Sequence, residues 1–167
     1  PTPFSDGHQP DLSYVHKATQ AIAPVLRKGN LVVLESTSPV GTTEQICAWI
    51  RKLRPDLKMP VSEGEDADVY VAHCPERVLS GRVLRELVDN DRIIGGISPA
   101  CAEAAEELYR SFVSGELHLT NARTAELAKL VENSFRDVNI AFANELSLIA
   151  ERMGIDVWEV IRLANRH

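Results

Sequence analysis

The stretch Leu31-Val-Val-Leu-Glu-Ser-Thr-Ser-Pro-Val-Gly-Thr-Thr43 decides the fold of this chain. Its first four residues form a short, continuous apolar run, which is typical of a strand covered on both faces by helices. Residues 35–44 are polar and suit a loop, and residues 45–53 are predicted to be helical. The stretch therefore predicts a strand, a polar loop and a helix in succession, the unit from which α/β proteins are built.

The same unit recurs along the rest of the chain. We expect further strands at 69–72, 92–95 and 116–119, and further helices at 12–28 and 99–112. Asp11 is the expected N-cap of the first of these helices and Gly29 its end, with a kink at Pro24. Ser98 is the expected N-cap of the second. Strands that alternate with helices predict a parallel sheet covered by helices.

Polar residues follow two of the predicted strands, where ligands bind in parallel sheets. Ser36 and Thr37 follow the first strand, and Glu76 follows the second. The loop that ends at Thr43 opens a helix, so free N–H groups, hydroxyls and the helix dipole favour a phosphate or a polarised amide there, although ordinary helix capping also explains them. A carboxylate such as Glu76 can act as a general base, although a lone loop glutamate is usually just solvated.

The chain continues into one long helix from Thr124 to Met153. Asn121 is its expected N-cap, Gly154 is expected to close it, and Asp156 is expected to open a last short helix. Apolar residues spread around most of its circumference, as in a helix buried on several sides, and the chain alone would leave many of them exposed. Because this helix is too long to be an ordinary sheet-covering helix, we expect it to lead into a second domain.

A narrow polar stripe interrupts the apolar surface of this helix. Lys129, Asn133 and Arg136 recur at helical spacing, so that an ammonium, an amide and a guanidinium project from one side. The stripe is either a solvated face or a site for an anionic or carbonyl ligand, and we favour the site.

Composition bounds the class of protein. Of 167 residues, 44% are hydrophobic and 25% charged, with a net charge of -6, which is ordinary for a globular protein. The negative charge argues against a nucleic-acid or membrane-surface partner, and no apolar run suits a transmembrane helix, so we expect a soluble, cytoplasmic protein. The three scattered cysteines suggest neither disulfides nor a metal site. The chain begins without methionine, and we expect it to be a piece of a longer protein.

Several motifs in their order resemble the UDP-glucose/GDP-mannose dehydrogenase family. They are Pro1-Thr-Pro3, the segment 35–44, Cys74-Pro-Glu-Arg-Val-Leu79, Asp91-Arg-Ile-Ile-Gly-Gly96 and Ala125-Glu-Leu-Ala-Lys-Leu-Val-Glu-Asn-Ser-Phe135. The resemblance implies an α/β fold: the second half of a Rossmann-like parallel sheet in an NAD-binding domain (1–120), then the long connecting helix of an all-α central region (121–167). Within the family, the sequence resembles most closely the members that act on UDP-N-acetylhexosamines.

The resemblance implies an NAD-dependent oxidation of the C6 alcohol of a UDP-sugar, closest to UDP-N-acetyl-D-mannosamine, to a uronate in two hydride transfers. The implied cofactor-binding residues are Thr2, Ser36, Thr37 and Thr43. The implied catalytic residues are Thr37, Glu76, Lys129 and Asn133, with Glu76 as the acid/base and the lysine and asparagine at the developing oxyanion. The implied substrate-binding residues are Arg77, Val78, Lys129, Asn133, Arg136 and His167.

The chain departs from the family pattern in three respects, one of which is Ser80, where the family often carries a second Glu after the Pro-Glu pair. The chain also has no Gly-x-Gly-x-x-Gly, and the nucleophilic cysteine of the family lies in a segment beyond the long helix. We therefore expect no dehydrogenase turnover from this chain alone. Two alternatives stay open: a UDP-N-acetylglucosamine 6-dehydrogenase, and a non-catalytic nucleotide-sugar-binding or dimerisation module. The expected partner is a second copy, bound through the long helix.

Overall fold

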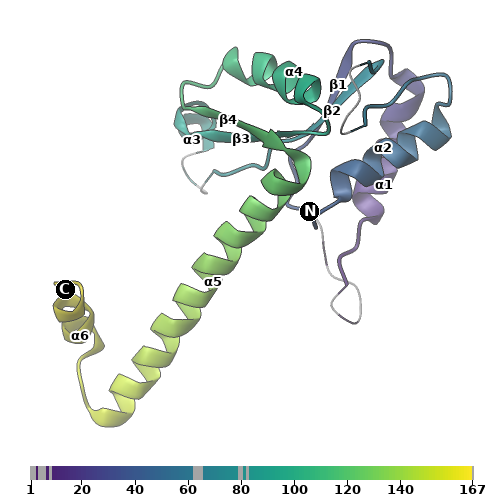
Figure 1. Cartoon of the computed structure of the whole chain (residues 1–167). Helices are drawn as coiled ribbons and strands as arrows, with labels where there is room; N and C mark the ends of the chain where they lie inside the picture. Colours follow the sequence, from purple (N-terminus) through teal and green to yellow (C-terminus); the bar gives the residue numbers. More distant parts are fainter. Residues whose placement is uncertain are drawn as a thin grey trace. The chain divides into compact units, whose positions relative to one another are not determined.

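The computed structural model forms two compact units along the chain, Pro1–Leu130 and Val131–His167 (Figure 1). The structure describes residues 3, 7, 9–61, 66–78, 81 and 83–166. The first unit combines a sheet with helices, and the second is helical.

Helices and strands alternate through the first unit. In chain order the elements are α1 (Ser13–Ile22), the 3-10 helix η1 (Ala23–Val25), β1 (Asn30–Leu34), α2 (Thr42–Leu53), β2 (Val69–His73), α3 (Val83–Asp89), β3 (Arg92–Gly96), α4 (Pro99–Arg110), β4 (Leu117–Asn121), α5 (Ala122–Met153) and α6 (Val157–Ala164). The boundary between the units falls within α5, and α6 belongs to the second. The alternation confirms the predicted α/β class.

The four strands form one mixed sheet in the order β1-β2-β3-β4. β1 pairs with β2, and β3 with β4, in parallel. β2 and β3 instead pair antiparallel, through Ala72 with Gly96 and His73 with Gly95. The prediction of a parallel sheet is therefore wrong between β2 and β3. Apolar runs show which residues form strands, whereas strand direction depends on the connection between them, which the apolar pattern does not specify.

The register brings the carboxyl ends of all four strands to one line across the sheet. Leu34, His73, Gly95 and Thr120 are successive partners along that line. The two parallel pairs run in opposite directions and overlap only at their last residues. The loops after β1 and β2 and the start of α5 therefore leave the sheet from neighbouring positions, and this convergence sets the place of the candidate site.

Helices cover both faces of the sheet (Figure 1). Val69 and Val71 of β2 pack into an apolar cluster with α1 and α2, whereas Ala72 packs into a second cluster with α4. Each parallel pair is connected by its own crossover helix, α2 between β1 and β2 and α4 between β3 and β4. Crossovers between parallel strands are almost always right-handed. Because the pairs run in opposite directions, right-handed crossovers place α2 and α4 on opposite faces.

The first helix is shorter than predicted. α1 ends at Ile22, and the chain continues as η1 because Pro24 has no N–H group for the helical hydrogen bonds. Its N-cap is Leu12, and the Asp11 carboxylate instead accepts the N–H of Ser13 at 2.8 Å. α3 is an element that we did not predict. None of its residues is buried, so no apolar face marks it in the sequence.

The other predicted caps are confirmed, whereas α2 begins at Thr42, within the predicted loop, and α4 ends at Arg110 rather than at residue 112. Ser98, Asn121 and Asp156 accept backbone N–H groups at the starts of α4, α5 and α6. Gly154 follows α5 with a φ of 67°, the left-handed conformation that commonly ends helices.

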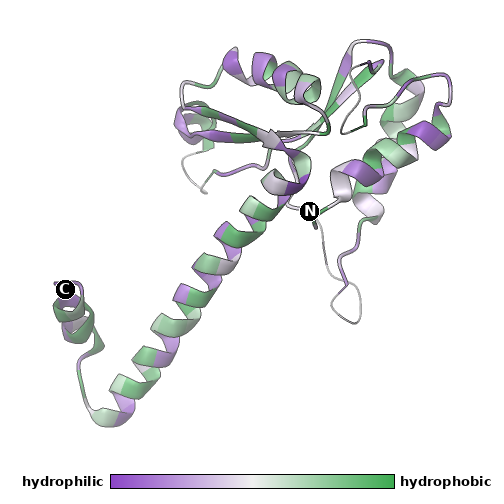
Figure 2. Ribbon diagram, viewed as in Figure 1, coloured by the Kyte–Doolittle hydropathy of each residue, from purple (hydrophilic) through white to green (hydrophobic). Residues whose placement is uncertain are grey.

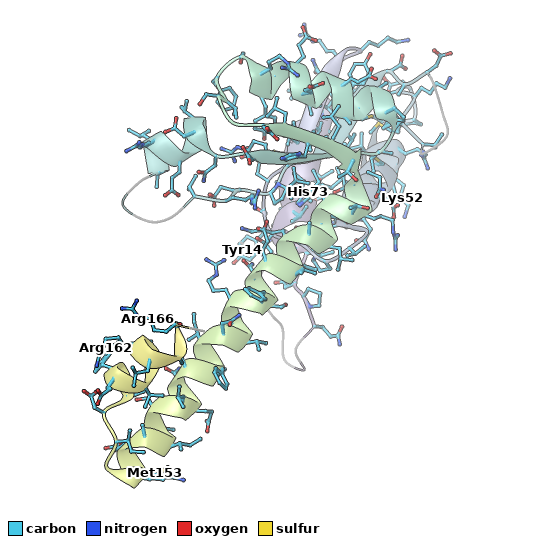
Figure 3. The ribbon with its side chains drawn as sticks, turned by 60° about the vertical axis from the view of Figure 1, so that its left-hand side comes forward. Tyr14, Lys52, His73, Met153, Arg162 and Arg166 are labelled. Atoms are coloured by element: carbon cyan, nitrogen blue, oxygen red, sulfur yellow. The ribbon has the colours of Figure 1, made fainter. Side chains whose placement is uncertain are left out.

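α5 and α6 carry many exposed apolar side chains, which alternate with hydrophilic ones along α5 (Figure 2). The exposed residues are Leu127, Val131, Phe135, Val138, Ile140, Phe142, Leu148, Ile149, Met153, Trp158 and Leu163, with Met153 marked at the end of α5 (Figure 3). The exposed fraction of the Phe135 side chain reaches 72%. The predicted distribution around the helix is confirmed, and so is the exposure expected of the chain alone.

Candidate functional site

Backbone hydrogen bonds hold the loops after β1 and β2 side by side. The Cys74 N–H donates to the Leu34 carbonyl at 3.1 Å, and the Glu76 N–H donates to the Glu35 carbonyl at 3.3 Å. These contacts continue the β1–β2 pairing beyond the strands themselves. The structure thus brings Glu76 beside the loop 35–41, as two parallel strands that end at one edge require.

The loop after β1 carries the hydroxyl groups predicted for ligand binding. Ser36 and Thr37 are half-buried there. The Ser38 hydroxyl donates to the Ser36 carbonyl at 2.9 Å, which stabilises the turn. Ser36 also lines a pocket of about 460 Å³ whose remaining walls come mostly from apolar side chains of α1 and β1. The loop therefore offers hydroxyl groups to a ligand beside an apolar hollow.

Tyr109 of α4 fixes the carboxylate at the start of this loop. Its hydroxyl donates to Glu35 Oε1 at 2.6 Å. Burial, together with this hydrogen bond, raises the pKa of Tyr109 above its ordinary value, so the phenol keeps its proton. The Arg92 guanidinium lies over the tyrosine ring, 5.9 Å from its centroid. The loop after β1 is thus tied to α4 as well as to β2.

The carboxylate of Glu126, in the first turns of α5, closes the N-terminus of α2. It is fully buried and accepts the Gly41 N–H at 2.6 Å, the Thr43 N–H at 2.8 Å and the Thr43 hydroxyl at 2.6 Å. Gly41 has a φ of 97°, a conformation that favours glycine. Negative charge at a helix N-terminus is also stabilised by the helix dipole.

These hydrogen bonds bear on the predicted role of Thr43. The sequence left both a ligand site and ordinary helix capping open for the N–H groups at the start of α2, and the structure binds those of Gly41 and Thr43 to Glu126. Thr43 is fully buried, and its hydroxyl is bound as well. The internal carboxylate therefore takes the place of an external anion. The contribution of Thr43 that we retain is to hold the loop that precedes it.

His73 is a fully buried histidine at the carboxyl end of β2 (Figure 3). Among the described residues, neither of its ring nitrogens meets a hydrogen-bonding partner at normal geometry. Burial lowers the pKa of His73 below its ordinary value, and the negative charge of Glu126 partly opposes this. The imidazole is therefore neutral at neutral pH.

The loop after β2 presents the carboxylate of Glu76 to solvent, where its Oε1 accepts the Val78 N–H. Val78 and Arg77 are half-buried. The Arg77 guanidinium donates to the Asp91 carbonyl at 3.5 Å, and the Arg77 carbonyl accepts the Asn90 side-chain amide at 3.1 Å. The loop is thus attached to the start of β3, while the carboxylate remains accessible to a ligand.

The polar residues of α5 differ in the hydrogen bonds that they make. Lys129 is half-buried in the first unit, and in the described part of the chain no hydrogen bond or ion pair involves its ammonium group. In the second unit the Arg136 guanidinium donates to Asn133 Oδ1 at 2.8 Å. The predicted spacing of the stripe is confirmed for this pair. The lysine keeps its charge available for a ligand.

Two predicted site residues, Thr2 and His167, lie outside the described residues. Within the described ranges, no group of three or more His, Cys, Asp or Glu side chains is arranged to hold a metal ion. Cys47, Cys74 and Cys101 are buried and free. Of the helices that the structure describes, none has the length and apolarity needed to cross a membrane.

Sequence reasoning missed Glu126, Tyr109 and His73. A signal for the first was present, because Glu126 shares a helix face with Ala122 and Leu130 and is therefore a carboxylate on an apolar face. Such a carboxylate needs hydrogen-bond donors when the face is buried. Nothing in the sequence pattern pointed to the donors on α2.

The chain matches the models of two domains from one family. Residues 1–113 match the NAD binding domain of the UDP-glucose/GDP-mannose dehydrogenase family, and residues 123–167 match its central domain. The boundary at residue 120 stays our proposal.

Curated relatives are similar over the whole chain. The NDP-N-acetyl-D-galactosaminuronic acid dehydrogenase of Ralstonia nicotianae is 65% identical over 167 residues. The UDP-N-acetyl-D-mannosamine dehydrogenase of Escherichia coli is 62% identical over 167 residues. Both alignments include 100% of this chain, which spans about 40% of the length of each relative.

Solved structures of relatives share the fold. The UDP-D-ManNAc dehydrogenase from Pyrococcus horikoshii has a TM-score of 0.89 at 52% identity, covering 99% of this chain and 38% of that one. The native UDP-N-acetyl-mannosamine dehydrogenase from Staphylococcus aureus has a TM-score of 0.85 at 46% identity, covering 100% and 39%. Motifs, fold and matched domains agree, and the chain belongs to the UDP-glucose/GDP-mannose dehydrogenase family.

Proposed function

We propose that the protein containing this chain oxidises the C6 alcohol of UDP-N-acetyl-D-mannosamine to a carboxylate in two NAD-dependent hydride transfers. The observation that supports this most directly is the convergence of the strand ends, which gathers the loops after β1 and β2 and the start of α5. Hydroxyls, a carboxylate and an ammonium group come from these segments. Alcohol oxidation needs a base for the proton, positive charge for the alkoxide and a place for the hydride acceptor.

The proposed cofactor contacts lie in the loop after β1. Ser36 and Thr37 are half-buried hydroxyl residues, Ser36 lines a pocket, and such groups fit the ribose and carboxamide of a dinucleotide. NAD, when bound, accepts the hydride from the alcohol carbon. Thr2 is proposed on the family resemblance alone, and Thr43 in the holding role described above. Because this chain has no Gly-x-Gly-x-x-Gly, its residues would hold only one side of the dinucleotide.

The proposed proton and charge transfers use residues from two loops and α5. The exposed Glu76 carboxylate takes the proton of the alcohol, directly or through a water molecule. The Lys129 ammonium stabilises the alkoxide that forms as the hydride leaves, and the Asn133 amide donates to the same oxygen and holds the water. Thr37 contributes its hydroxyl at the same step.

The other proposed substrate-binding residues are Arg77, Val78, Arg136 and His167. Arg77 and Val78 are placed by the attachment of their loop to β3. Arg136, whose guanidinium already contacts Asn133, would bind the anionic part of the nucleotide sugar. His167 is proposed on the family resemblance alone.

The full-length protein tests this proposal in a substrate panel. UDP-N-acetylmannosamine is expected to yield about two NADH per sugar, as two hydride transfers require. The panel includes the gluco and galacto epimers of the N-acetylhexosamine, UDP-glucose and GDP-mannose. A higher kcat/KM with UDP-N-acetylglucosamine would favour the alternative 6-dehydrogenase. Turnover of UDP-glucose or GDP-mannose alone would contradict the proposed substrate class.

We further propose a cytoplasmic homodimer formed through α5. The support is the set of exposed apolar side chains of α5, including Phe135 and Phe142, because large apolar side chains left exposed together mark interfaces. Light scattering after size exclusion is expected to give the mass of two chains, and a monomer at every concentration would contradict the dimer. The same surface favours the alternative of a non-catalytic dimerisation module, which NADH formation in the substrate panel would exclude.

A further inference from the structure

Glu126 is a charged residue with no exposed surface, at 0%. Its two carboxylate oxygens accept all three hydrogen bonds from Gly41 and Thr43, at 2.6 to 2.8 Å. Removing a carboxylate from water is costly unless charge-assisted hydrogen bonds replace the lost hydration. A helix is commonly capped by a residue next to it, at lower cost. The capping group of α2 instead comes from α5, far along the chain.

The two segments that these hydrogen bonds join carry proposed reacting groups. The loop of Thr37 leads directly into Gly41, and Lys129 follows the carboxylate by three residues on α5. Close packing fixes the same helical turn from another side, since a Cβ on Gly95 would lie 2.6 Å from the Cβ of Ala125. The start of α5 is therefore held both by the carboxylate and by β3.

We propose that Glu126 is a positioning residue for the alcohol oxidation. Its carboxylate keeps the loop of Thr37 and the turn of Lys129 at a constant separation without itself touching substrate or cofactor. This inference rests on the proposed function. Enzymes lose rate steeply when reacting groups are displaced by small distances, so loosening the contact acts on kcat more than on substrate binding.

The test uses the full-length enzyme with Glu126→Gln, which keeps the shape of the side chain and removes its charge. kcat is expected to fall by about 100-fold, while the KM for the sugar nucleotide stays within about threefold. Thr43→Val is expected to be about tenfold slower than Thr43→Ser, which keeps the hydroxyl donor. Glu103→Gln makes the same change at an exposed position of α4 and is expected to keep the wild-type kcat.

Amide hydrogen exchange on the same variants separates loss of the hydrogen bonds from loss of the fold. The glutamine of Glu126→Gln offers only one acceptor oxygen, so either the Gly41 or the Thr43 N–H loses its acceptor and exchanges faster. Protection in β2 and α4 is expected to stay unchanged. In Glu103→Gln the amides at the start of α2 are expected to exchange as in the wild type.

Faster exchange with unchanged kcat in both Glu126→Gln and Thr43→Val would overturn the inference. If Glu126→Gln fails to fold, the two Thr43 variants decide: equal kcat values overturn it, and the tenfold difference supports it. A wild-type enzyme that turns over no sugar nucleotide overturns the proposed function and this inference with it. Normal wild-type turnover with insensitive variants overturns this inference alone.

Discussion

Replacing Lys129 by alanine is expected to lower the kcat of the full-length enzyme by about 100- to 1,000-fold. The ammonium group has no partner among the described residues, so its charge is available to the alkoxide that forms during hydride transfer. A charge that acts on the transition state affects kcat, and the KM for the sugar nucleotide is expected to change little. Steady-state kinetics with the nucleotide sugar and NAD measures both constants.

The folding of the Lys129→Ala variant is the control for this prediction. A half-buried lysine contributes little to stability, so the melting temperature is expected to stay within a few degrees of the wild type. Lys52→Ala removes the same charge from an exposed position of α2 (Figure 3) and is expected to leave kcat unchanged. If Lys129→Ala unfolds the protein but leaves turnover per folded molecule intact, the lysine is structural and its proposed role is wrong.

Replacing Gly95 by alanine is expected to destabilise the chain by about 3 kcal/mol, at the upper end for overpacked sites. A Cβ at this position would lie 2.6 Å from the Ala125 Cβ, 2.6 Å from the Asn121 carbonyl oxygen and 2.8 Å from the Ala122 Cα. Two of these neighbours are backbone atoms, which cannot rotate away. For a chain of this size the melting temperature should fall by roughly 10 °C. Urea unfolding followed by circular dichroism measures the free energy.

A double variant tests the cause of that loss. Adding Ala125→Gly to Gly95→Ala removes one of the close neighbours and leaves the contacts with the Asn121 oxygen and the Ala122 Cα. Only part of the lost stability is therefore expected to return. An unchanged unfolding free energy in Gly95→Ala would show that α5 can move away from β3, and that close packing does not fix the start of this helix.

All elements of the fold except α3 followed, at least in part, from local patterns in the sequence. Runs such as Leu31 to Leu34 are apolar enough to mark strands without further information, and Ser98 and Asn121 mark helix starts by their side-chain chemistry. The antiparallel pairing of β2 with β3 could not be predicted in this way. It depends on four residues at two strand ends and on a connection whose helix, α3, buries no side chain.

In the candidate site, too, contacts between neighbouring residues could be predicted and contacts between distant residues could not. The spacing of Asn133 and Arg136 in one helix is a local property, and the contact between them follows from it. The hydrogen bonds of Glu126 join residues more than eighty positions apart, and the one between Tyr109 and Glu35 joins residues more than seventy apart. Contacts of this kind depend on the completed sheet, so the pattern of neighbouring residues does not predict them.

The two-residue contact between β2 and β3 also has a kinetic consequence. Each parallel pair, with its own crossover helix, is a separate βαβ motif, and the strands of the two motifs pair through Ala72 with Gly96 and His73 with Gly95. The loop between β3 and β4 is shorter than that between β1 and β2, so its closure costs less entropy. We therefore expect the β3–α4–β4 motif to form first during folding and the pairing of β2 with β3 to form last. The line of strand ends that carries the candidate site would then be completed only in the final step of folding.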